Sequence, residues 1–149
     1  MSKYFEDFVL GETFSIPPKT LSDSHFRAFA KMTGDAHPIH YDDEYAKKTR
    51  FGKRVTHGLL LTAMTAMGAS TLSPLVEDSM VAFIEQSSRF LKPVLIGDTI
   101  APELEVSELI PKTETGIVRL SSRVKNQRGE IVLEGMHAYL IKKRPDKVT

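Results

Sequence analysis

The sequence contains no cysteine and no tryptophan among its 149 residues. The absence of cysteine excludes a disulfide framework, a thiolate nucleophile and a cysteine-ligated zinc site. A chain without thiols is compatible with a reducing compartment, so we expect a cytoplasmic protein. The remaining composition, 41% hydrophobic and 26% charged, is that of an ordinary folded protein. We therefore expect a single domain over residues 1–149 with a substantial buried core.

The sequence also lacks an excess of charge of either sign and a long apolar run. Twenty basic and nineteen acidic side chains give a formal net charge of +1. No dense stripe of lysine and arginine is interleaved with aromatic residues, so we expect no nucleic-acid partner. The longest apolar stretch, GLLLTAMTAMGA, is shorter than the ~20 residues of a membrane-spanning helix, and the start, MSKYFEDFVLGE, lacks a signal-peptide core. We expect no membrane association.

The first half of the chain has the periodicity of helices. Residues 22–34 predict a short helix, because Ser22 suits the N-cap position and Gly34 suits the position after the last turn. Residues 57–72 predict a second helix that is apolar almost all round. A helix without a polar face must be enclosed by other elements, so we expect it to form the buried centre of the fold.

From Met80 onward the hydrophobic period changes to two. Val118, Leu120 and Val124 alternate with charged residues, and NQRG at residues 126–129 is typical of a turn, so a long antiparallel hairpin is predicted. About five strands are expected in total, the first near residues 13–16. The inner face of such a sheet needs an apolar partner, and the second helix is an adequate one. The predicted fold class is α+β, an antiparallel sheet wrapped around a long buried central helix.

Ionisable side chains are concentrated between the two predicted helices, in MTGDAHPIHYDDEYA at residues 32–46. The three acids at positions 42–44 are typical of the first turn of a short helix, and we assign them no chemistry. Asp35 and His40 differ, because Pro38 fixes the backbone between them and can aim both side chains into one cleft. A carboxylate and an imidazole on either side of one water can share acid–base work.

A metal site is the alternative interpretation of this turn. Asp35, His37, His40 and Asp42 are all potential ligands within eight residues. Zinc sites in enzymes usually take two ligands from a helical i, i+4 pair and a third from a distant segment. The two histidines here flank a proline on a bend, so we expect no metal site.

The octapeptide RVTHGLLL, residues 54–61, is the second cluster of interest. Thr56 suits the N-cap of the apolar helix, which leaves the amides of His57 and Gly58 without intrahelical acceptors. Such amides can stabilise a developing oxyanion, and the missing Cβ of Gly58 lets a carbonyl ligand approach the backbone. The same residues could serve only to start a core helix, and the octapeptide alone does not separate these interpretations.

The ionisable turn resembles the signature of the MaoC-like dehydratases, the (R)-specific enoyl-CoA hydratases. That signature runs Gly-Asp-x-Asn-Pro-hydrophobic-His, followed by five residues and Ala. The positions that fill it here are Gly34, Asp35, Pro38, Ile39, His40 and Ala46. RVTHGLLL and RFLKPVLIGDTI are also similar to that family, so the resemblance covers most of the chain. The family's usual Asn is His37 in this sequence, a ring whose hydrogen bonding depends on its tautomer.

The resemblance implies the hot-dog fold and a homodimer, or a higher oligomer, with sites at the subunit interface. It implies a thioester substrate on coenzyme A or acyl carrier protein, with no metal and no separate cofactor. Asp35 and His40 would hold the water that adds to a trans-2-enoyl thioester, and the Gly58 amide would polarise the carbonyl. The product would be an (R)-3-hydroxyacyl thioester. The substrate-binding residues we expect are His37, Pro38, His57 and Arg54.

Two other functions remain open for a hot-dog protein, because a fold does not fix an activity. An acyl-CoA thioesterase would place an acid on the central helix, but no Asp or Glu occurs between Gly58 and Glu77. A non-catalytic subunit that binds acyl thioesters would be expected to lack Asp35 or His40, and both are present. The cations Lys47, Lys48, Arg50, Lys53 and Arg54 crowd the segment before the oxyanion turn and are candidates for the phosphates of coenzyme A.

Overall fold

The structure, a computed structural model, describes residues 1–146. Its centre is one antiparallel sheet with the strand order β1-β4-β5-β6-β3, and β2 pairs with β4 off this path. The strands are β1 (Thr13–Ser15), β2 (Lys19–Thr20), β3 (Met80–Phe90), β4 (Thr99–Pro111), β5 (Thr115–Lys125) and β6 (Ile131–Lys142). The α-helices are α1 (Asp23–Thr33), α2 (Asp43–Lys47) and α3 (Gly58–Ala63). Short 3₁₀ turns are η1 (Phe5–Asp7), η2 (Pro38–His40), η3 (Met67–Ala69) and η4 (Ser73–Leu75).

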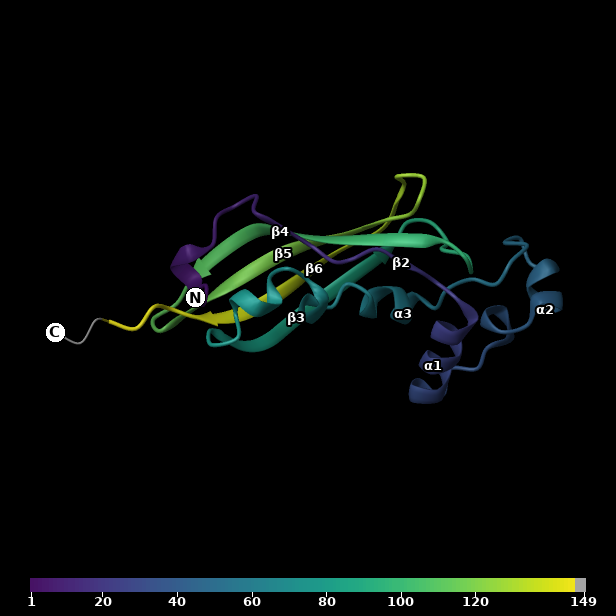
Figure 1. The fold of residues 1–149 in the computed structure, drawn as a ribbon, viewed down its shortest axis with the longest axis horizontal. Helices are drawn as coiled ribbons and strands as arrows, with labels where there is room; N and C mark the ends of the chain where they lie inside the picture. Colours follow the sequence, from purple (N-terminus) through teal and green to yellow (C-terminus); the bar gives the residue numbers. More distant parts are fainter. Residues whose placement is uncertain (147–149) are drawn as a thin grey trace.

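The ribbon in Figure 1 shows how these elements are arranged. The four long strands run along the molecule, and α1 and α2 lie beyond one end of the sheet. The N-terminus lies near the opposite end, and α3 leads away from the α1 and α2 end under the sheet. No helix within residues 1–146 is long and apolar enough to cross a membrane.

The hairpin of β5 and β6 confirms the alternation found in the sequence. Val118, Leu120 and Val124 are buried on the inner face. On the outer face Arg123 lies between two acids of β4, 3.2 Å from Glu103 and 2.9 Å from Glu105. Period-two sequences place every second residue on the same face, so this sheet has an apolar inner face and a charged outer face.

The helix α1 also confirms its sequence signals. Ser22 is the N-cap residue and forms a capping box with His25, while Gly34 takes a left-handed conformation with φ 80 at the C-cap. Phe26 and Phe29 are the buried residues of this helix. Because Gly34 ends the helix at a fixed angle, the residues that follow it turn back toward α3.

The central helix is much shorter than predicted. Instead of residues 57–72, α3 covers only Gly58–Ala63, and the chain continues through η3 and η4. The Thr65 hydroxyl donates to the Thr62 carbonyl at 2.6 Å, and it lies 3.0 Å from His137 Nε2 on β6. A threonine hydroxyl that bonds a carbonyl of the last turn competes with continuation of the helix. Nor is the helix enclosed on all sides, since Leu59 is 71% exposed.

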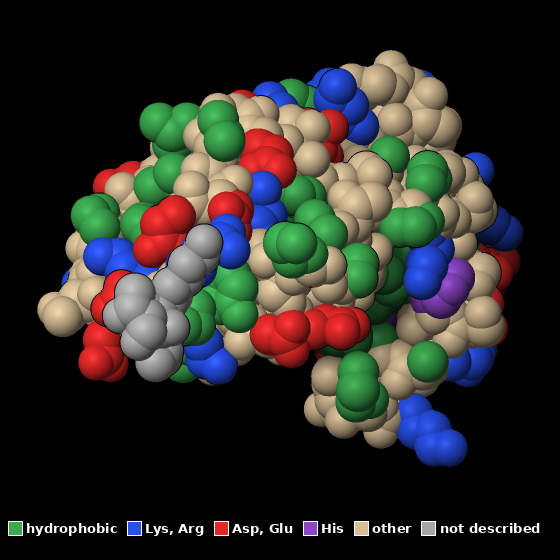
Figure 2. All heavy atoms as spheres, turned by 60° about the vertical axis from the view of Figure 1, so that its left-hand side comes forward, with side chains coloured by type: hydrophobic (Ala, Val, Ile, Leu, Met, Phe, Trp, Pro, Cys, Tyr) green, Lys and Arg blue, Asp and Glu red, His purple; other side chains and the backbone are tan. Residues whose placement is uncertain are grey.

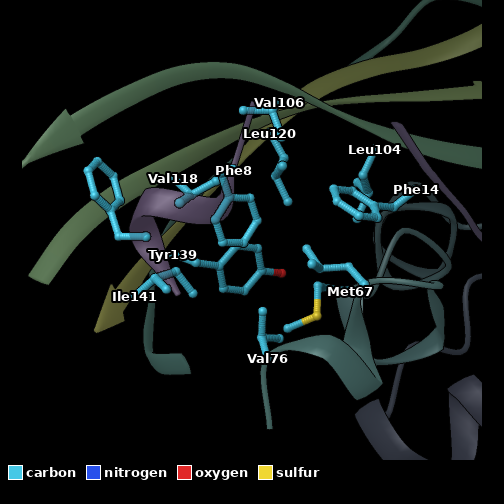
Figure 3. Packing of buried hydrophobic residues seen from close by; sticks show 12 residues of the cluster. Phe8, Phe14, Met67, Val76, Leu104, Val106, Val118, Leu120, Tyr139 and Ile141 are labelled. Carbon is cyan, nitrogen blue, oxygen red and sulfur yellow. The ribbon is translucent and has the colours of Figure 1, made fainter. Parts of the chain in front are cut away.

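The buried apolar residues form two clusters. The first contains Phe5, Phe8, Phe14, Met67, Leu72, Val76, Leu104, Val106, Val118, Leu120, Tyr139 and Ile141. The second, nearer α1, contains Leu21, Phe26, Phe29, Leu60, Leu61, Val94, Ile100, Val124, Val132 and Leu133. In the first cluster the Tyr139 hydroxyl points toward Met67 (Figure 3), and it also lies 3.0 Å from His137 Nδ1. The second cluster supports the α1 side of the fold, where the ionisable turn lies.

Candidate active site

The ionisable turn is a rigid bend between α1 and α2. His37 has extended backbone angles (φ −61, ψ 131), and Pro38 begins the 3₁₀ turn η2 that ends at His40. A residue before proline is pushed into the extended region, and the fixed φ of proline suits the first position of a helical turn. Asp42 then caps α2 by accepting from the Tyr45 amide at 3.0 Å. The acids of α2 therefore start a helix, as predicted.

The bend brings Asp35 and His40 together and adds His57 to them. One carboxylate oxygen of Asp35 and one ring nitrogen of each histidine all lie within 4.8 Å of one another. His40 Nδ1 lies 2.6 Å from the Val55 carbonyl. A carbonyl can only accept, so Nδ1 carries the proton and Nε2 of neutral His40 presents a lone pair. Both Asp35 and His40 are partly exposed, so water and a ligand can reach them.

Tyr41 is a residue of this site for which the sequence predicted no role. Its hydroxyl donates to the Asp35 carbonyl at 2.5 Å and lies 3.3 Å from the Phe26 carbonyl. The same oxygen is 2.6 Å from His57 Nε2. Because both carbonyls only accept, the single proton of Tyr41 goes to them and Nε2–H of His57 donates to the tyrosine oxygen. The Tyr41 hydroxyl therefore connects α1, the start of the bend and the residue before α3.

His57 is a neutral, enclosed ring that supports His40. Its residue is 2% exposed, and its ring contacts Phe26 and Phe29 with centroid distances of 5.4 and 4.6 Å. Its ring stacks on that of His40 with centroids 3.8 Å apart. Burial, and then the neighbouring His40, lower the pKa of His57 to about 4. The ring is therefore uncharged near neutral pH, and its position beneath His40 differs from the direct substrate contact that we expected for it.

The cluster of Asp35, His40 and His57 has the ligand types of a metal site but not the geometry. The two imidazole rings are nearly parallel, with an interplanar angle of 23°. Imidazole lone pairs lie in the ring plane, so two stacked rings aim them side by side instead of toward one point. The donor set therefore does not fit a tetrahedral ion.

Gly58, which follows His57 in the chain, borders a cavity of about 330 Å³ that Asp35 and His40 do not line. Other lining residues are Arg50, Thr56, Leu61, Phe90 and Val94. Gly58 is the first residue of α3, so its amide belongs to those that have no acceptor within the helix. A Cβ at this position would lie 3.2 Å from the Phe90 ring. Glycine thus lets the Phe90 ring lie close to the backbone at this position, and access of a carbonyl ligand to the Gly58 amide stays a prediction. The N-cap residue of α3 is His57 and not Thr56.

Two other predicted substrate-binding residues are engaged with the protein itself. His37 Nδ1 accepts from the Ile39 amide at 3.2 Å, so its ring caps η2. It is the His37 backbone amide that donates to Asp35 Oδ1, at 3.3 Å. The Arg54 side chain is only 10% exposed and forms ion pairs with Asp23 and Asp43. Arg54 is thus placed as an internal cation and not at an exposed phosphate site.

The comparisons with known proteins identify the fold and the family. A Mycobacterium tuberculosis protein described as having a double hot-dog fold superposes with a TM-score of 0.78 and 25% identity, covering 99% of this chain and 46% of that one. The sheet and its short central helix are thus a hot-dog fold. The family model described as MaoC like domain matches residues 7–127. The chain belongs to the MaoC-like family.

The relatives include enzymes with named activities. A 3-hydroxybutyryl-CoA dehydratase of Methylorubrum extorquens is 36% identical over 132 residues, which cover 89% of this chain and 80% of that protein. An (R)-specific enoyl-CoA hydratase of Rhodospirillum rubrum is 31% identical over 141 residues, covering 95% of this chain and 93% of the relative. This chain is therefore similar, over nearly its whole length, to proteins named as a dehydratase and as a hydratase of CoA thioesters.

Proposed function

We propose that this protein is a hydro-lyase that reversibly adds water to trans-2-enoyl thioesters and forms (R)-3-hydroxyacyl thioesters. The observation that supports this most strongly is the pairing of Asp35 and His40, in which a carboxylate oxygen and a ring nitrogen lie within 4.8 Å of each other. Two hydrogen bonds of ~2.8 Å that meet at one water span such a gap. The names of the two relatives describe hydration of an enoyl thioester and its reverse.

The pair divides the work of activating water. The Asp35 carboxylate accepts one hydrogen bond from the water, and the lone pair on His40 Nε2 accepts the other. In hydration the water oxygen bonds to C3 and one of its O–H bonds breaks. The released proton passes through the pair to C2, which receives the electron pair of the former double bond. No electron is gained or lost overall, so the step needs no redox cofactor, and we propose that it needs no metal.

The Gly58 amide supplies the third element of the mechanism. Addition at C3 places negative charge on the thioester oxygen, and a fixed N–H at the start of α3 is suited to stabilise it. The cavity that Gly58 borders also contains Arg50. We propose that the thioester enters through this cavity and that Arg50 meets a phosphate of coenzyme A or of the acyl carrier protein's prosthetic group.

We also propose that two copies associate through β3. Within the described residues β3 pairs only with β6, so its other side is an edge of the sheet. Phe83 is 53% exposed, Ile84 48% and Phe90 52%, and Leu59 on α3 is also exposed. A long apolar edge strand is a site for pairing with another chain, and identical chains most often pair as a twofold dimer. Phe90 lines the same cavity as Gly58, so the dimer would complete the proposed entrance for the thioester. A cytoplasmic location remains a prediction.

The surface also bears on the choice of partner. Acidic and basic side chains interleave on the face that Figure 2 shows, with no continuous field of one sign. A nucleic acid requires a continuous basic surface, which this face does not offer. A small thioester that is bound in a local cavity does not require a continuous basic surface.

The experiment that tests the proposed function is a panel of trans-2-enoyl-CoA thioesters of graded length. Absorbance of the conjugated double bond should fall when the protein is added, and chiral analysis should identify the (R)-3-hydroxy product. Release of free thiol is measured in parallel. Thiol release without loss of the double bond would indicate a thioesterase, and binding without either change would indicate a non-catalytic subunit.

A further inference from the structure

Residues 54–56 form an extended segment that braces the turn carrying His40. The Val55 amide donates to the Ile39 carbonyl at 3.3 Å, and the Val55 carbonyl accepts Nδ1–H of His40 at 2.6 Å. On its other side Val55 pairs with Leu95 in an antiparallel bridge. Leu95 thus holds the segment on one side, and on the other side the segment holds the η2 turn through Ile39 and His40.

The Arg54 side chain extends this brace to both flanking helices. Its Nη1 donates to Asp23 at 2.6 Å and to the His40 carbonyl at 3.3 Å. Its Nε donates to Asp43 at 3.1 Å. Asp23 is the first residue of α1 and Asp43 the first of α2. One guanidinium therefore connects the start of each helix with the backbone of the histidine that lies between them.

We infer that Arg54 is a positioning residue of the active site, which with Asp23 and Asp43 holds the His40 turn at the distance from Asp35 that one water can bridge. This assignment rests on the proposed hydration reaction. Arg54 acts through His40 and contacts neither the substrate nor the reacting atoms. Misplacing a reacting group by about 1 Å can lower a rate on the order of 100-fold, so a brace of this kind controls turnover.

The chemistry of the contacts explains why an arginine is needed. A guanidinium presents its donors in a rigid planar fork, whereas a lysine ammonium is a point charge on a flexible stem. Lysine would keep the positive charge between the two carboxylates but could not hold Asp23, Asp43 and His40 in fixed relative positions. The hydrogen bond from Arg54 is also the first cause that lowers the pKa of Asp23, with Arg27 contributing next.

The fold should survive the loss of this brace. The Asp23 and Asp43 side chains are 44% and 70% exposed, so water can solvate both carboxylates when Arg54 is replaced. Of the three charged side chains in this brace, Arg54 is the buried one, and its replacement leaves no buried charge without a partner. Kinetic effects can therefore be separated from unfolding.

The test compares Arg54→Lys with the wild type on two substrates, trans-2-butenoyl-CoA and the trans-2-butenoyl thioester of N-acetylcysteamine, which has no phosphate. Arg54→Lys should lower kcat about 10- to 100-fold on both substrates and leave both KM values unchanged. Asp43→Asn should lower kcat on both substrates by a smaller factor. Because the two residues act as one unit, the double variant should lose no more than Arg54→Lys. Lys31→Met, which removes an exposed cation from the last turn of α1, is the control and should retain kcat.

A structural readout accompanies the kinetics. His40 Nδ1–H donates to the Val55 carbonyl, and its downfield ¹H resonance should broaden or shift in Arg54→Lys but not in Lys31→Met. A higher KM for the CoA substrate alone, with kcat retained, would instead make Arg54 a phosphate ligand and overturn the assignment. Unchanged kinetics would overturn it as well. Failure of the wild type to hydrate either thioester would overturn the proposed function and this assignment with it.

Discussion

The imidazole ring of His57 lies under that of His40, with ring centroids 3.8 Å apart and an angle of 23° between the planes. His57 is buried and uncharged at neutral pH, because burial lowers its pKa to about 4. A charged ring at this distance would oppose protonation of His40, which must carry a proton during turnover. The neutral state of His57 is thus a requirement of the proposed mechanism as well as a property of the fold.

The first prediction concerns how the free energy of unfolding depends on pH. The pKa of His57 is lower in the folded protein than its ordinary value of 6.5, and burial also lowers that of His137. Below about pH 6.5 the unfolded chain therefore binds more protons than the folded chain. The contribution of the neutral histidines to the free energy of unfolding is fully present above that pH and is lost as pH falls toward 4. For His57 alone the loss is roughly 2–3 kcal/mol.

Urea unfolding at pH 7.5, 6.0 and 5.0 measures this dependence. The free energy of unfolding should fall with each step, and the fall should be shallower in His57→Leu. A free energy that stays constant or rises between pH 7.5 and 5.0 would contradict the neutral, buried state of His57.

The second prediction concerns Tyr41, whose hydroxyl joins the Asp35 carbonyl to His57. Tyr41→Phe leaves Nε2–H of His57 without its acceptor, so it should lower the free energy of unfolding by about 1–3 kcal/mol. It should also lower kcat by about tenfold, because the start of the bend is less firmly held. Tyr45→Phe, at an exposed tyrosine of α2, is the control. Equal kcat values for Tyr41→Phe and Tyr45→Phe would show that the Tyr41 hydroxyl has no role in catalysis.

The third prediction concerns the approach to the Gly58 amide. In Gly58→Ala the new Cβ meets the Phe90 ring at 3.2 Å and narrows the cavity. Because Phe90 is half exposed and can move, the fold should tolerate the change. We expect kcat/KM to fall about 10- to 100-fold through misplacement of the thioester carbonyl. Adding Phe90→Ala should recover part of the loss, and no recovery would mean that the Cβ obstructs the ligand directly.

The fourth prediction concerns the β3 edge. Ile84→Lys places a charge on the exposed apolar strand and should shift the molecular mass measured by light scattering from dimer to monomer, with loss of activity on dilution. Val9→Lys, at an exposed apolar residue outside β3, should leave the mass unchanged. A wild-type protein that is monomeric and fully active at every concentration would contradict the proposed dimer.

The strands and the first helix could be predicted from sequence because their signals are local. Val118, Leu120 and Val124 show the period of the hairpin, and Ser22 and Gly34 show both ends of α1. These features depend on residues that are close together in the chain. They were sufficient to predict a sheet packed against an apolar helix.

The features that could not be predicted depend on contacts between distant residues. The apolar run after Gly58 continues past Ala63, but Thr65 meets His137, 72 positions away, near the end of the helix. In the sequence Arg54 belongs to a basic segment and is a candidate phosphate ligand. The structure shows that it pairs with Asp23, which is 31 positions away. Tyr41 lies inside the signature, yet its partner His57 is 16 positions away. The signature identified Asp35 and His40, while the residues that hold them required the structure.

The central claim is that Asp35 and His40 activate one water together, and the kinetics of Asp35→Asn test it most directly. Asparagine keeps the shape of the side chain and removes the carboxylate, so folding and KM should be retained while kcat for loss of the conjugated double bond falls by on the order of 10²–10⁴. His40→Gln should lose a similar factor, and the double variant should lose little more, because groups that act as a unit are not additive. Hydration by Asp35→Asn at the wild-type rate would contradict the mechanism.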